Sequence, residues 1–182
     1  MVLEKPIVFI DQSMQAKEQR KEVQGVWTTI SREVIPIPLP DYVVARVKTG
    51  MMGGHKLRVC VGTDSQQFLR HIEFASVVVI YLIGQGGSMV MRRFRETRPF
   101  TLRERLMHEV SLSIDIAWPL LEPLEKLGAS IEVHADINED PRFPSHVAYQ
   151  EARGYVRGMG LTFKAKPEAF ASSCCADALV HS

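Results

Sequence analysis

Hydrophobic residues near the middle of the chain fall into short runs with the composition of β-strands. Residues 57–65 carry small or apolar side chains on both faces up to Gly62, which predicts a strand covered on both sides in the middle of a sheet. Residues 72–83 are rich in valine and isoleucine, a glycine-rich turn follows at 84–87, and residues 88–94 run back. The pattern predicts an antiparallel meander of three strands.

The C-terminal part alternates between helical and strand patterns. Thr101 and Glu104 have the spacing of a capping box, and an apolar stripe follows at Leu102, Leu106, Val110, Ile114, Ala117 and Leu121. We expect Pro119 to kink or restart this helix and Gly128 to end it. The later elements are predicted as a strand at 130–136, a helix at about 147–157, a strand near 161–165 and a last helix with Pro167 in its first turn.

Three meandering strands followed by strands with helical crossovers predict an α/β fold with a mixed five-stranded sheet flanked by helices. This order of elements is that of the ribonuclease H fold. We place the domain at residues 51–182. Residues 1–50 are expected to form an N-terminal extension, with an extended proline-rich connector at 35–40, because alternate residues there lack the amide donor.

One acidic residue in each of four predicted elements is a candidate for chemistry. Asp64 ends the first strand, Glu109 borders the apolar stripe of the helix, Asp136 ends the fourth strand, and Asp177 lies among small residues in the last helix. The predicted fold brings these positions together over one edge of the sheet. Asp64 and Asp136 have an ordinary interpretation as turn acids and Glu109 as a solvated helix acid, whereas the small residues around Asp177 disfavour a merely solvated role. With 21 acidic residues such a set could arise by chance.

Five short motifs lie in order along the chain. They are Gly62-Thr63-Asp64-Ser65-Gln66, Leu102-Arg103-Glu104-Arg105 with Glu109-Val110, His134-Ala135-Asp136, Lys166-Pro167, and Ala171-Ser172-Ser173 with Ala176-Asp177. Together they resemble the bacterial YkuK-like family of ribonuclease H-like proteins, from about residue 57 to the C-terminus. The resemblance implies that Asp64, Glu109, Asp136 and Asp177 form the acidic set. Residues 137–141 depart from the glycine-rich turn expected there.

Four clustered carboxylates are expected to need cations, because like charges at short range raise each other's pKa values. Mg²⁺ or Mn²⁺ suits a set of ligands that are all oxygen. Two such ions about 4 Å apart would activate a water and stabilise the leaving oxygen of a phosphodiester. We expect Asp64 to bridge both ions, Glu109 and Asp136 to complete their shells, and Asp177 to hold the second ion or tune product release. The predicted function is a metal-dependent nuclease.

Two histidines are candidates for proton transfer in such a site. They are His134, two residues before Asp136, and His181 near the C-terminus. An ordinary structural or surface role is the alternative for both.

Substrate binding is predicted at a local basic stretch, because the net charge of +1 gives no global attraction for a polyanion. Residues 91–105 contain Arg92, Arg93, Arg95, Arg98, Arg103 and Arg105, and Lys164 and Lys166 would extend the patch. The alternative for these arginines is an ion-paired edge strand. The expected partner is nucleic acid, and no motif chooses between RNA, DNA and hybrid.

Composition limits the remaining interpretations. Cys60, Cys174 and Cys175 have no ligand spacing and form no even set, which indicates a reducing compartment and a cytoplasmic location. The longest apolar stretch, 75–83, is far shorter than a membrane span. The alternative function is a catalytically inactive module of the same fold that binds nucleic acid or protein. A phosphate-transferring ATPase is disfavoured, because the chain is too short for two lobes and has no second phosphate loop.

Overall fold

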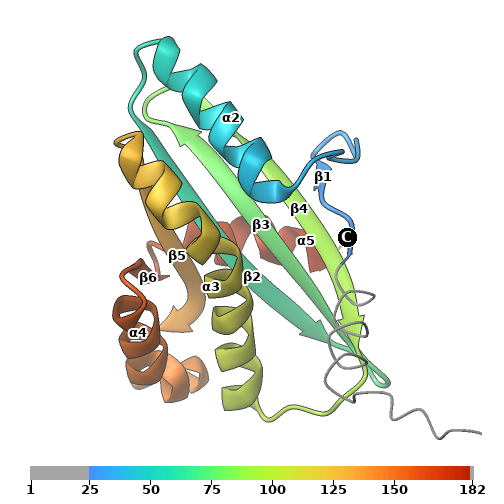
Figure 1. The fold of residues 1–182 in the computed structure, drawn as a ribbon. Coiled ribbons are helices and arrows are strands. Elements are labelled where there is room, and N and C mark those ends of the chain that lie inside the picture. Colours follow the sequence, from blue (N-terminus) through green and yellow to red (C-terminus); the bar gives the residue numbers. More distant parts are fainter. Residues whose placement is uncertain (1–24, 181–182) are drawn as a thin grey trace, which may run out of the picture.

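The computed structural model describes residues 25–180, which form a mixed six-stranded sheet covered by helices (Figure 1). The predicted features of residues 1–24 and of His181 lie outside the described residues. The elements are β1 Thr28–Thr29, α2 Leu39–Met52, β2 Leu57–Gln67, β3 Ile72–Leu82, β4 Gly86–Glu96, α3 Leu102–Lys126, β5 Ser130–Asn138, η1 Pro144–Ala148, α4 Tyr149–Gly158, β6 Thr162–Lys166, η2 Ala171–Ala176 and α5 Asp177–Val180.

The strands lie in the order β1-β4-β3-β2-β5-β6. The meander of β2, β3 and β4 is antiparallel over its whole length, while β5 pairs parallel to β2 and β6 pairs parallel to β5. The predicted α/β class and order of elements are confirmed. The sheet has six strands where five were expected, because the two residues of β1 pair with β4 at the edge.

The two faces of the sheet are covered by different helices. On one face, β2 contributes Val59 and Val61 to a core that also contains buried residues of α2, α3 and α4. On the other face, Cys60 packs in a smaller cluster with Ala171 and Ala176 of η2. Successive strand residues point to opposite faces, so β2 is apolar on both sides, as its sequence indicated.

Helix α3 follows its predicted boundaries closely. Thr101 and Glu104 form the capping box, and Gly128, at a φ of 73°, follows the last turn. The expectation that Pro119 restarts the helix is wrong, because α3 continues to Lys126. Leu120 and Leu124, both fully buried, hold the segment beyond the proline against the core and offset the loss of one backbone hydrogen bond.

The proline-rich connector and the last helix differ from expectation. Helix α2 already begins at Leu39, because Pro40 occupies its first turn, where no amide donor is needed. Val43 and Val47 of α2 are fully buried in the larger core, so this helix packs with the sheet. Pro167 stays in the turn after β6, and the last helical segment begins near Ala171, where Ser173 N donates to Ala169 O. Among residues 25–180 no helix combines the length and hydrophobicity that a membrane crossing requires.

Candidate functional site

An open cleft of about 630 Å³ lies where β2, α3, β5 and α5 approach one another. Its lining includes all four carboxylates predicted from the sequence, which are Asp64, Glu109, Asp136 and Asp177. Two of the predicted basic residues, Arg105 and Lys166, also line it. The fold therefore brings residues that are more than a hundred positions apart in the chain to one surface recess.

Strand pairing places Asp64 and Asp136 side by side. β2 and β5 run parallel, with Gly62 opposite His134 and Thr63 opposite Ala135. A Cβ on Gly62 would point at Ser172, and the ring of His134 contacts Ala171, so both residues face η2. Asp64 and Asp136 follow two residues later and therefore face the same way. Neither ends its strand as predicted, because β2 continues to Gln67 and β5 to Asn138.

Glu109 reaches the cleft from α3, on the opposite face of the sheet. Ser65 follows Asp64 and so points toward α3, where its Oγ donates a hydrogen bond of 2.5 Å to Glu109 Oε1. The Arg105 guanidinium donates to Ser65 O at 2.8 Å and to Ser65 Oγ at 2.9 Å, and lies 3.6 Å from Glu109 Oε1. Ser65 thus joins the carboxylate on the helix to the strand that carries Asp64.

The electrostatic setting favours the protonated form of two of these acids. Burial raises the pKa of Asp64 to about 7, and the charges of Asp136 and Asp177 add to this effect. Burial and then the charge of Asp64 raise the pKa of Glu109 to about 8. The hydrogen bond from Ser65 and the charge of Arg105 oppose the rise at Glu109 without cancelling it. Mutually destabilised carboxylates of this kind are typical of sites that bind cations or protons.

Asp177 is held at the cleft by a close contact between η2 and β2. A Cβ on Gly62 would lie 2.5 Å from Ser172 N and 2.8 Å from Ala171 C, so only glycine permits this approach. The side chains of Ser172 and Ser173 both donate to Ala169 O, which fastens the first turn of η2. The helix then delivers Asp177 directly after the π-helical turn.

Lys166 and Asp136 form an ion pair at the border of the cleft. Lys166 Nζ lies 2.8 Å from Asp136 Oδ1. A built-in cation therefore neutralises one member of the acidic set. Within residues 25–180 the four carboxylates do not form a group whose ligand atoms all lie within 4.8 Å of one another.

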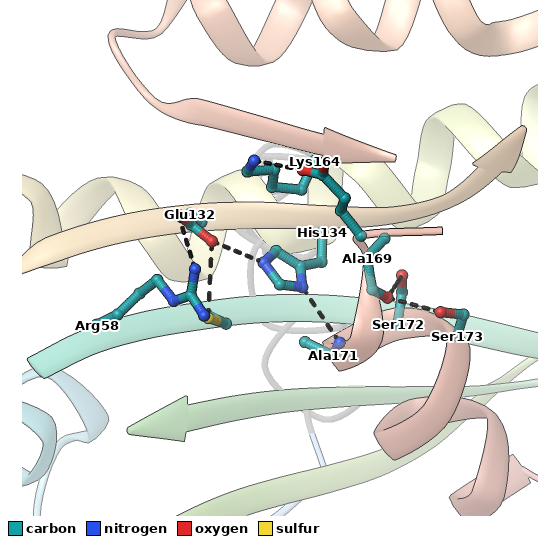
Figure 2. A network of polar contacts seen from close by, with 10 residues as sticks. Arg58, Glu132, His134, Lys164, Ala169, Ala171, Ser172 and Ser173 are labelled. Carbon is teal, nitrogen blue, oxygen red and sulfur yellow. Dashed lines mark hydrogen bonds and ion pairs between the residues drawn. The ribbon is translucent and has the colours of Figure 1, made fainter. Parts of the chain in front are cut away.

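A different group does meet that distance, and it consists of Cys60, Glu132 and His134. Figure 2 shows Glu132 and His134 side by side on β5, with their side chains pointing toward each other. These residues lie on the same face as Asp64 and Asp136, because they occupy even-numbered positions of the paired strands β2 and β5. Ala171 N donates to His134 Nδ1 at 3.2 Å, so the proton of the ring is on Nε2, which donates to Glu132 Oε2 at 3.1 Å. Arg58 Nη1 lies 3.5 Å from Glu132 Oε1. Burial raises the pKa of the Cys60 thiol to about 12.

The hydrogen bonds of His134 and the raised pKa of the Cys60 thiol favour a hydrogen-bonded network over a metal site at this group. A histidine ligand would need a free ring nitrogen, and a cysteine ligand would need to be a thiolate. Both ring nitrogens of His134 are engaged and the residue is almost fully buried, so the network ties β5 to η2 and leaves no open nitrogen for proton transfer.

The predicted arginine patch is largely occupied by internal contacts. Arg92 is buried, with its guanidinium 5.1 Å from the ring centroid of Trp27, and so offers no surface for phosphate. Three further arginines of the stretch are paired with acids: Arg95 with Glu73, Arg98 with Glu96, and Arg103 with Glu151. Arg93 lies exposed on β4. Strand β4 is separated from β2 by β3, so its arginines do not line the cleft, and of the predicted basic residues only Arg105 and Lys166 do.

Sequence reasoning missed three features of this site. The alternation of strand residues could have assigned Ser65 to the face that packs against α3, but it could not have predicted the hydrogen bond from Ser65 to Glu109. Glycine is required at position 62 because η2 approaches the backbone there. Phe143, which is half-exposed, lines the cleft from the irregular segment after β5. Neither a close approach nor the path of a long loop leaves a local signal in the sequence.

Comparison with known proteins places the fold. A search of curated proteins gave no match. Among solved structures, the N-terminal RNase H domain of a Mycobacterium tuberculosis protein, fused to maltose-binding protein, is similar with 10% identity over 69% of this chain and 95% of that chain, at a TM-score of 0.33. RNase H1 from the halophilic archaeon Halobacterium salinarum is similar with 18% identity over 69% of this chain and 99% of that chain, also at 0.33. The family model described as Ribonuclease H-like matches residues 42–180, and the chain therefore belongs to the ribonuclease H-like family.

Proposed function

We propose that this protein is a divalent-metal-dependent nuclease that hydrolyses phosphodiester bonds of nucleic acid at the cleft. The observation that carries the proposal is the convergence of Asp64, Glu109, Asp136 and Asp177 on one open recess. Membership of the ribonuclease H-like family supports a function in cleaving or binding nucleic acid, although a fold alone does not fix a reaction. The finer assignment to the bacterial YkuK-like group is part of the same proposal, as is the cytoplasmic location inferred from the cysteines.

The donor set fits Mg²⁺ or Mn²⁺. All four side chains offer carboxylate oxygens, the ligands these ions prefer. Burial, with a further contribution from neighbouring acids, raises the pKa values of Asp64 and Glu109, and a bound divalent cation would stabilise their ionised forms. Bound ions would supply charge neutralisation at the phosphate and a more acidic water.

The chain's own residues have separate tasks in this proposal. Asp64 and Asp136, on neighbouring strands, would hold the ions together with Glu109 and Asp177. Ser65 orients Glu109 through its hydrogen bond, and Arg105 holds Ser65 in place. Lys166 is positioned to exchange its contact with Asp136 for one with a substrate phosphate.

Cleavage of labelled RNA, DNA and hybrid oligonucleotides tests the proposal. With Mn²⁺ we expect the wild type to cleave at least one of the three, and we expect Asp64→Asn and Glu109→Gln to abolish cleavage. Glu122→Gln is the matched control, because Glu122 is an exposed acid on α3, paired with Lys126 and outside the cleft. A chelator should stop the reaction. Cleavage that survives both Asp64→Asn and chelation would contradict the proposed site.

A binding module without catalysis is the second candidate, and the ion pair between Lys166 and Asp136 favours it. Because Lys166 already neutralises the charge of Asp136, a cation is less needed to stabilise the four carboxylates in the cleft. If this candidate is correct, nucleic-acid binding is unchanged by chelator and by Asp64→Asn, and no oligonucleotide is cleaved with either metal.

A further inference from the structure

A second recess of about 300 Å³ lies at the β6 edge of the sheet, next to the acidic cleft. Four cations line it, Arg153 and Arg157 from α4 and Lys164 and Lys166 from β6, against the two acids Glu139 and Glu168. Lys166 lines both recesses. The basic recess therefore borders the site proposed for hydrolysis and has the opposite sign of charge.

The two arginines of this recess have open binding capacity. Within residues 25–180, neither Arg153 nor Arg157 has a carboxylate within ion-pair distance. The two acids of the recess have other partners, since Glu168 forms an ion pair with Lys164 and Glu139 accepts a hydrogen bond from the Tyr149 hydroxyl. The arginines are four residues apart on α4, where like charges disfavour a helix. A bound anion would remove this repulsion.

Among the described residues, two other regions predicted for substrate contact are less suited to a polyanion. The acidic cleft has four carboxylates against Arg105 and Lys166, so it cannot hold a nucleic acid strand by its own charge. The arginines on and after β4 are buried or paired for the most part, and two strands separate β4 from β5. Arginine forks suit phosphate oxygens, and the recess has the scale of one or two phosphate groups.

We propose that Arg153 and Arg157, together with Lys164 and Lys166, form a phosphate-binding subsite that holds the nucleic acid backbone as it leaves the acidic cleft along the β6 edge. This inference rests on the proposed function, because the strand is assumed to pass through that cleft. It assigns substrate contact to α4 and β6 in place of the arginines of β4.

Binding of a short fluorescein-labelled single-stranded RNA in EDTA, measured by anisotropy over a range of salt concentrations, tests this subsite without any cleavage. For Arg153→Gln/Arg157→Gln we expect at least about a tenfold weaker affinity at low salt and a log–log salt slope smaller by about 1.4, the value for two lost phosphate contacts with a single strand. Arg93→Gln/Arg95→Gln and the charge-matched Arg46→Gln/Lys48→Gln, on exposed positions of α2, should bind within about twofold of the wild type.

Each outcome decides for or against the subsite. An unchanged affinity and salt slope in the α4 variant, or a loss found instead in the β4 variant, would overturn it, as would a wild type that does not bind the RNA. Binding of Mn²⁺ to the same variants separates this result from the proposed function. The α4 variant should bind Mn²⁺ as the wild type does, and failure of RNA binding alone would leave the metal site standing.

Discussion

At the scale of single residues, the account depends on the protonation of Asp64 and Glu109. Their pKa values in the folded chain, about 7 and about 8, lie above those of ordinary carboxyl groups. The folded chain therefore binds more protons than the unfolded chain between about pH 4 and pH 8, and the free energy of unfolding should fall as pH rises through that window. The opposing cation at this site is Arg105, and the neighbouring acids are Asp136 and Asp177.

Denaturant unfolding in EDTA from about pH 5 to about pH 8 measures this effect. We expect Asp64→Asn to flatten the decline and to stabilise the chain at the alkaline end, on the order of 1 to 3 kcal/mol, because one unit of pKa displacement corresponds to about 1.4 kcal/mol. Glu122→Gln should keep the wild-type profile, since Glu122 is exposed. Parallel profiles for wild type and Asp64→Asn would show that Asp64 is not strained. Saturating Mn²⁺ should also flatten the wild-type profile.

At the scale of elements, the closest contact that positions the site is between β2 and η2. Gly62→Ala would place a Cβ 2.5 Å from Ser172 N, and backbone atoms cannot move aside as a flexible side chain can. We expect a loss of unfolding free energy of about 2 to 4 kcal/mol and a weaker response to Mn²⁺, because η2 carries Asp177. Gly154→Ala, inside α4 with open space around its Cβ, is the matched control and should be neutral or slightly stabilising. Equal unfolding free energies for the two variants would contradict the tight approach.

The elements also show what the sequence could and could not predict. The apolar runs of β2 and β3, the alternation in β5 and the capping box of α3 are local signals, and they predicted the order of elements along the chain and the element that carries each of the four acids. The missed features depend on distant partners. Helix α3 continues past Pro119 because Leu120 and Leu124 are buried in the core. The basic stretch predicts Arg92 at the surface, but Arg92 is buried and its guanidinium lies over the ring of Trp27, which is far away in the chain. Local composition carries no record of such partners.

At the scale of the whole molecule, α2 belongs to the same core as the sheet, although the sequence analysis began the domain only at residue 51, in the last turn of this helix. Val47 is fully buried in the core that contains β2 and α3, whereas Val34 is mostly exposed. We expect Val47→Ala to lower the free energy of unfolding by about 2 kcal/mol, because it leaves a cavity, and Val34→Ala to change it by less than about 0.5 kcal/mol. Thermal or denaturant unfolding measures both. Similar values for the two would indicate that α2 does not stabilise the domain.

The central claim is that four carboxylates from β2, α3, β5 and α5 form one divalent-metal site, and calorimetric titration of Mn²⁺ at low salt tests it most directly. We predict saturable binding by the wild type and by Glu122→Gln, and loss of that binding in Asp64→Asn. Heat signals and affinity in Asp64→Asn equal to those of the wild type would contradict the claim, because the ion would then be held elsewhere.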